Sequence, residues 1–138
     1  MTGARSDRGS AAVELVLVTP VLIALLLFVV MLGRLGSARA TVDAAARDAA
    51  RAASIARSPS AAQTAGKDAA NVSTRTAGLR CAPLSIEITG DDRSGTTIEA
   101  TVSCTVSLGD LALGLHIPAT KTLTGHFIAP IDRYRGNP

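Results

Sequence analysis

A chain of 138 residues is long enough for one domain and little more. Its net charge of +3 comes from 14 basic and 11 acidic residues that are interleaved along the chain, and it has only two Phe, one Tyr and no Trp. Because nucleic-acid binding requires a concentrated basic face with stacking aromatic residues, this composition argues against a nucleic-acid partner.

A long apolar run lies near the start of the chain. From Leu15 to Gly33 it contains no charge, and Thr19 is its one polar side chain. At about 1.5 Å of rise per residue, the run makes a helix of about 28 Å, close to the thickness of the hydrocarbon core of a bilayer. We therefore predict a transmembrane helix over residues 10–35.

Two residues are expected to shape this helix. Ser10 can act as its N-cap, because a serine hydroxyl accepts a hydrogen bond from a first-turn amide. Pro20 removes one backbone hydrogen bond and should kink the helix, which membrane helices tolerate better than soluble ones.

Residues 36–78 are predicted to be an Ala-rich helical segment. Residues 37–58 continue the first helix, since Ala is the strongest helix former. One stripe of small side chains consists of Ala45, Ala49, Ala52 and Ala56. This stripe is either a face against which another backbone packs closely or simply the surface of a stable helix. Ser58-Pro59 then ends the first helix and begins a weaker one over residues 60–73.

Residues 79–138 are predicted to form a small antiparallel β-sheet outside the membrane. Alternation of apolar and polar residues indicates three strands, at 84–89, 96–108 and 121–129. A turn at 90–95 joins the first two strands into a hairpin, and a Gly-rich loop at 109–118 precedes the third. The fold class is therefore α+β, with a long N-terminal helix followed by the sheet.

The hairpin register follows from keeping the apolar residues on one face. Placing Ile88 opposite Ile98, and Ile86 opposite Ala100, satisfies this condition.

Cys81 and Cys104 are the only cysteines, and neither has a nearby Cys or His that would complete a zinc site. Outside the cytoplasm a single disulfide is the natural expectation, the alternative being two buried thiols. In the predicted register Cys81 lies across from Thr105 and on the face opposite to Cys104. A bulge at Pro83 would turn Cys81 inward and allow the bond.

Catalytic motifs are not recognised in this sequence. His116 and His126, the only histidines, are predicted to be surface residues, and Asp91-Asp92 falls in a turn that offers too few ligands for calcium. We therefore expect no enzyme activity, metal, cofactor or small-molecule substrate.

Glu14 is unexpected at the start of the apolar run, because a carboxylate is costly there. It could lie at the membrane interface, where the helix dipole favours an anion. Alternatively, the N-terminus is an ordinary secretory signal, with Arg5 and Arg8 as its basic region and cleavage after Ala40. In a third interpretation, Gly9 followed by SAAVE is the G|xxxxE pattern of a type IV prepilin.

The third interpretation accounts for more residues at once. Residues 1–9, MTGARSDRG, are a short basic leader, and cleavage after Gly9 would make Ser10 the first residue and Glu14 the fifth. The new α-ammonium would then lie one helical turn from the Glu14 carboxylate. In a bundle of such helices, Glu14 of one subunit could neutralise the amine of a neighbour.

The stretch RGSAAVELVLVTPVLIALLLFVVMLGR, followed by VDAAARDAARAASIAR, resembles the TadE-like family of pilin-related proteins, particularly the actinobacterial type. The shared features are the RG-x-A-x-VE start, a Pro within the membrane helix and the Ala-Arg stretch beyond it. The resemblance covers residues 8–57 well, and GHFIAPIDRYRG extends it loosely over residues 121–136.

The resemblance implies a pilin-like minor pilin or pseudopilin of a tight-adherence (Flp-type) pilus apparatus. Its partners would be a prepilin peptidase, which cuts after Gly9, and other pilins, which meet it through Glu14 and the N-terminal helix. Arg5 and Arg8 favour a cytoplasmic N-terminus and an extracytoplasmic sheet. Two arginines, Arg34 and Arg39, also lie on the other flank of the membrane helix, so the number of basic residues is equal on the two sides. The alternatives are a secreted binding protein and an uncleaved single-pass anchor.

Overall fold

The computed structural model describes the backbone of residues 7–90, 96–111 and 118–131, and the side chains of residues 13–90, 96–109 and 118–131. Most of the predicted leader and turn, the centre of the Gly-rich loop and the C-terminal tail lie outside these ranges. Asp91, Asp92 and His116 therefore lie outside the described residues.

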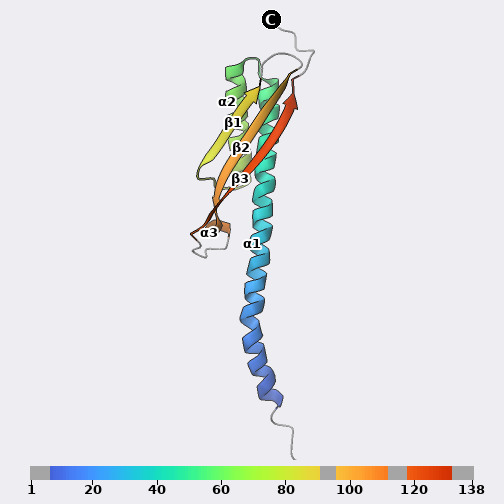
Figure 1. The fold of residues 1–138 in the computed structure, drawn as a ribbon, viewed down its shortest axis with the longest axis vertical. Helices are drawn as coiled ribbons and strands as arrows, with labels where there is room; N and C mark the ends of the chain where they lie inside the picture. Colours follow the sequence, from blue (N-terminus) through green and yellow to red (C-terminus); the bar gives the residue numbers. More distant parts are fainter. Residues whose placement is uncertain (1–6, 91–95, 112–117, 132–138) are drawn as a thin grey trace, which may run out of the picture.

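The described chain is an α+β structure with a long N-terminal helix, which confirms the predicted fold class (Figure 1). Its elements in chain order are α1 (Asp7–Ile55), α2 (Pro59–Thr76), β1 (Leu84–Gly90), β2 (Thr97–Ser107), α3 (Leu108–Leu111) and β3 (Thr120–Pro130). The three strands form one antiparallel sheet in the order β1-β2-β3. All three predicted strands are present, within one or two residues of the expected ends.

Helix α1 is continuous from the membrane-length run into the Ala-rich segment. It begins at Asp7 and passes through Pro20 without ending. The prediction that Ser10 caps the helix is therefore wrong. The backbone of residues 7–9 is helical, so the helix starts before Ser10.

The sheet and α2 pack against the C-terminal half of α1, whereas its N-terminal half extends away from them (Figure 1). The buried face of α1 is made of small side chains: Ala38, Val42, Ala45, Ala46, Ala49, Ala50 and Ala53. The alternating residues of β2 cover part of it: Ile98, Ala100, Val102, Cys104 and Val106. The core is therefore aliphatic, as the composition predicts.

Helix α2 begins where the sequence predicts. The Ser58 hydroxyl accepts a hydrogen bond from the Ala61 amide at 3.3 Å, and Pro59 occupies the first turn. Its buried face consists of Ala62, Gly66, Ala70 and Thr74, all small residues. This face packs on α1 and contacts β1. We call α2, the three-stranded sheet and the C-terminal half of α1 that they cover the head of the molecule.

Two glycines permit the closest approaches to α1. A Cβ atom on Gly125 of β3 would lie 2.7 Å from the Val42 carbonyl oxygen, inside van der Waals contact. A Cβ atom on Gly66 of α2 would lie 3.1 Å from the Ala49 carbonyl oxygen and would also clash with the Ile88 side chain. Backbone therefore packs directly on backbone on two sides of α1.

The predicted hairpin register is wrong by two residues. Ile88 pairs with Ala100 and Ile86 with Val102, whereas Ile98 lies opposite Gly90. A shift of two residues keeps every side chain on its predicted face, so the pattern of burial is retained. The observed register lets Ile88 fill the space beside Gly66.

Gly125→Ala should destabilise the head because the added methyl group has no room beside the Val42 carbonyl. Overpacking of this kind costs about 1–3 kcal/mol, which lowers the melting temperature of a domain of this size by roughly 5 °C or more. Thermal proteolysis of the full chain in detergent micelles measures the shift. Gly36→Ala is the matched control, because nothing lies within 4 Å of its added methyl group. A control variant as unstable as Gly125→Ala would contradict the explanation.

Candidate functional site: the exposed half of helix α1

The N-terminal half of α1 exposes a continuous apolar surface. Between Val13 and Leu32 most of its large apolar side chains are exposed, by 36% (Val30) to 71% (Val16), and only Leu27 and Met31 are half-buried. This segment is the part of the described chain that is long and apolar enough to cross a membrane. The exposed surface of α1 is therefore either lipid-facing or covered by other helices.

Charged residues mark the two ends of this surface. Glu14 lies at its start and Arg34 just beyond its end, so the charges stand about 30 Å apart along the helix, close to the thickness of the hydrocarbon core. Inside the run, the Thr19 hydroxyl donates a hydrogen bond of 2.6 Å to the Leu15 carbonyl. The one polar side chain between Leu15 and Gly33 is thus satisfied within the helix itself.

The predicted processing and assembly residues share the first turns of α1. Gly9 and Ser10 lie in helical backbone shortly after its start, and Glu14 follows one turn beyond Ser10. The Glu14 side chain is exposed and has no hydrogen-bond or ion-pair partner within the described part of the chain. Its carboxylate is therefore available to a group outside this chain.

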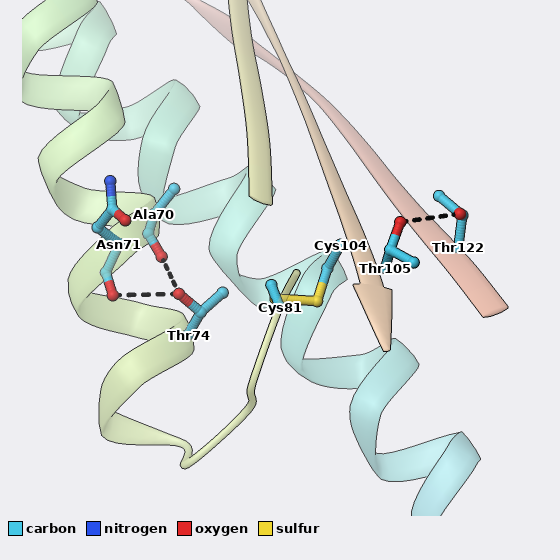
Figure 2. Close-up of a disulfide and its surroundings, with 7 residues drawn as sticks. All are labelled: Ala70, Asn71, Thr74, Cys81, Cys104, Thr105 and Thr122. Atoms are coloured by element: carbon cyan, nitrogen blue, oxygen red, sulfur yellow. Dashed lines mark hydrogen bonds between the residues drawn. A yellow bond between two sulfur atoms is a disulfide. The ribbon is translucent and has the colours of Figure 1, made fainter. Parts of the chain in front are cut away.

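The predicted disulfide is present between Cys81 and Cys104, whose Cα atoms lie 5.0 Å apart. Cys104 is fully buried and shares the inner face of β2 with Val102 and Val106. Figure 2 shows the bond linking the segment after α2 to β2. It joins the connection between α2 and β1 to the central strand of the sheet.

Just before β1, the chain pairs irregularly with β2 around Pro83, where the bulge was predicted. The Ala82 amide donates to the Thr105 carbonyl at 2.8 Å, and the Thr105 amide donates to the Pro83 carbonyl at 3.1 Å. Ala82 and Pro83, which precede β1, thus both bond to Thr105, a two-to-one pairing of the kind found in β-bulges. Ala82 and Pro83, rather than Cys81, lie across from Thr105.

The outer face of the sheet is polar. Thr105 bonds Thr122 across the strands at 3.0 Å (Figure 2), and Ser103 bonds Thr124 at 3.3 Å. His126 is exposed, as predicted, and its Nε2 lies 2.6 Å from a Glu99 carboxylate oxygen on β2. This pair was not predicted, although side chains that lie diagonally across neighbouring strands are close enough to interact. Among the described residues, no group of three or more His, Cys, Asp or Glu could hold a metal ion.

The predicted Ala stripe is only partly correct. Ala45 and Ala49 are fully buried, but Ala52 and Ala56 are only half-buried. The buried face of α1 is wider than the predicted stripe, because the sheet and α2 cover adjoining sides of the helix. An almost uniform run of Ala gives no contrast in hydrophobicity from which its orientation could be predicted.

The fold defines a class of protein: an α+β head carried on a single helix that is long and apolar enough to span a membrane. Residues 9–51 match the family model described as TadE-like protein, which confirms the resemblance found in the sequence. The match begins at Gly9 and ends within the buried half of α1. No curated protein and no solved structure matches the chain.

The TadE-like match associates the chain with the tight-adherence pilus system. The matched segment is the part of α1 that contains Glu14, the exposed apolar surface and the beginning of the small-residue face. The candidate functional site is therefore this helix, carried by a disulfide-bonded head.

Reduction of Cys81–Cys104 should weaken the head substantially. For a closed loop of this length the chain-entropy estimate is about 3 kcal/mol. Dithiothreitol should therefore lower the thermal-proteolysis midpoint of the native chain. The double variant Cys81→Ala/Cys104→Ala should start from a lower midpoint and show no response to dithiothreitol. An equal response of both proteins would contradict a stabilising bond.

Proposed function

We propose that the chain is a minor pilin or pseudopilin-like structural component of a tight-adherence (type IVc) pilus or a related secretion apparatus, of the actinobacterial type, processed by a prepilin peptidase after Gly9. The supporting observation is α1 itself. It is one unbroken helix, exposed and apolar in its first half and buried beneath the head in its second. Such a helix suits a subunit that is held in a membrane and then packs against other helices.

Glu14 is proposed as the assembly carboxylate. It lies at the edge of the exposed apolar surface, one helical turn after Ser10. Cleavage after Gly9 would leave an α-ammonium on Ser10, and within a bundle of apolar helices each charge would be costly without a partner. The amine of one subunit and the Glu14 carboxylate of the next would neutralise one another.

A secreted binding protein cut after Ala40 is the competing proposal, and the packing of α1 argues against it. Helix α1 is continuous through Ala38, Arg39 and Ala40. Ala38 is buried within the head, and fully buried Val42 follows one turn later. A cut after Ala40 would remove part of the core and leave the remainder of α1 starting beneath the sheet.

The proposed partners are a prepilin peptidase and other pilins, and the proposed orientation places the head outside the cytoplasm. The Cys81–Cys104 disulfide supports a location of the head outside the cytoplasm, because disulfides persist in oxidising compartments. Arg5 and Arg8 support a cytoplasmic N-terminus. An uncleaved anchor would share this orientation but keep residues 1–9.

Glu14→Ala tests the proposed role. The variant should insert into the membrane as well as the native chain, since the substitution removes a charge. Its co-purification with partner pilins should fall more than about tenfold, because breaking a buried pair costs about 3 kcal/mol or more. Quantitative mass spectrometry of affinity-purified complexes measures the loss.

Glu87→Ala is the matched control, since Glu87 is an exposed carboxylate on β1 of the head. It should co-purify with partner pilins as the native chain does. Normal co-purification of Glu14→Ala would contradict the assembly role and leave Glu14 as an interfacial residue.

A further inference from the structure

The C-terminal half of α1 carries a row of charged residues that the sheet and α2 leave uncovered. Arg39, Asp43, Arg47 and Arg51 follow one another at intervals of four residues, which places them on one ridge of the helix surface. The three arginines are exposed and Asp43 is half-buried, so the row is open to a partner. We call these four residues the charged ridge.

The charged ridge is not neutralised within the described part of the chain. Asp43 and Arg47 are close enough to pair across one helical turn, yet neither makes a hydrogen bond or ion pair with another described residue. The same holds for Arg39 and Arg51, and for the exposed Asp48 beside the ridge. The ridge therefore presents charges of both signs to a group outside this chain.

The order of these charges selects how a second copy of the chain can lie alongside. In a parallel pair with no axial offset, Asp43 would face Asp43 and Arg47 would face Arg47, and like charges repel. An offset of four residues, about 6 Å, brings opposite charges to the same level instead. Arg47 of the first copy is then level with Asp43 of the second, and Asp43 of the first with Arg39 of the second. Asp48 of the second copy comes close to the level of Arg51 of the first.

The proposed assembly contact at the start of α1 requires the same offset. Glu14 follows Ser10 by four residues, so the Glu14 carboxylate of the first copy is level with the Ser10 amine of a second copy displaced in the same direction. Glu14 and Asp43 are 29 positions apart, about eight complete turns, and thus lie on the same side of α1. A single displacement satisfies the contacts at both ends of the helix.

We propose that the charged ridge docks against the same ridge of a second copy of this chain, parallel to it and displaced by one helical turn. The inference rests on the proposed function and deepens it, because it adds a second contact along α1 and names the offset between copies. Glu14 fixes one end of a long helix, whereas the ridge would hold the two heads at a defined relative height.

Disulfide formation between single cysteines in two copies measures this offset. Gly36 and Ala40 are exposed one turn apart on α1, and nothing lies within 4 Å of a Cβ atom added at Gly36. Membranes are prepared from cells that make two full-length variants, Gly36→Cys and Ala40→Cys, and are treated with a mild oxidant. The native Cys81–Cys104 bond is already closed and does not compete.

The mixed pair, which joins position 40 of one copy to position 36 of the other, should form at least about fivefold faster than either like pair. A disulfide requires Cβ atoms about 4 Å apart, and the offset holds the like pairs about 6 Å out of level. Copies that pack without an offset would give the like pairs instead.

Charge reversal tests whether the ridge sets the offset. Arg47→Asp in the Ala40→Cys chain should slow the mixed pair about fivefold, because an attraction between neighbouring charges becomes a repulsion. Asp43→Arg added to the Gly36→Cys chain should restore the rate, since the ion pair is formed again with its signs exchanged.

The same substitution in the other copy is the matched control. Arg47→Asp in the Gly36→Cys chain places the new carboxylate level with Arg51 of the first copy, so it should not slow the mixed pair. Each variant must keep the native midpoint in thermal proteolysis, which shows that its head is folded.

Four results would overturn the proposal. They are like pairs that form as fast as the mixed pair, the absence of any disulfide between copies, equal slowing by Arg47→Asp in the two chains, and no restoration by a folded Asp43→Arg variant. Any of these, together with lost co-purification of Glu14→Ala, would remove the ridge contact and leave the proposed function intact. A dominant mixed pair with normal co-purification of Glu14→Ala would retain the ridge contact and contradict the assembly role of Glu14.

Discussion

The structure depends on the close packing of backbone against the small-residue face of α1. Gly125 brings β3 against the Val42 carbonyl, and Gly66 brings α2 against the Ala49 carbonyl. No aromatic residue lies on this face, so its van der Waals contacts are made by close approach of the backbones rather than by large side chains. The disulfide adds a covalent link between the segment after α2 and β2, which compensates for a thin core.

The two halves of α1 have opposite requirements, and a single helix meets both. Leu, Val and Ile in the first half give a wide apolar surface that suits lipid or neighbouring helices. Ala in the second half gives helix stability with almost no side-chain volume, so a sheet and a helix fit around it. The TadE-like match spans the junction, over residues 9–51, which agrees with a function that needs both halves joined.

The elements of the fold could be predicted from the sequence because their periodicities are long and unambiguous, as in the alternation from Ile98 to Val106. The hairpin register could not, since a shift of two residues preserves the buried face and only tertiary contacts such as Ile88 beside Gly66 decide it. The disulfide was predicted because Cys81 and Cys104 are the only cysteines and the sheet was expected to lie outside the cytoplasm. The pair of His126 and Glu99 was not predicted, because the two residues lie diagonally across β2 and β3 and their proximity depends on the register of these strands.

The central claim is that the mature chain keeps the apolar half of α1 joined to the head and loses only the residues up to Gly9. The most direct test is intact mass measurement with N-terminal sequencing of the protein purified from its native membrane. The account predicts an N-terminus at Ser10, which makes Glu14 the fifth residue. An N-terminus at Thr41 would mean that the apolar half is a discarded signal, and an intact N-terminus at Met1 would mean an unprocessed anchor. Either of these would contradict the account.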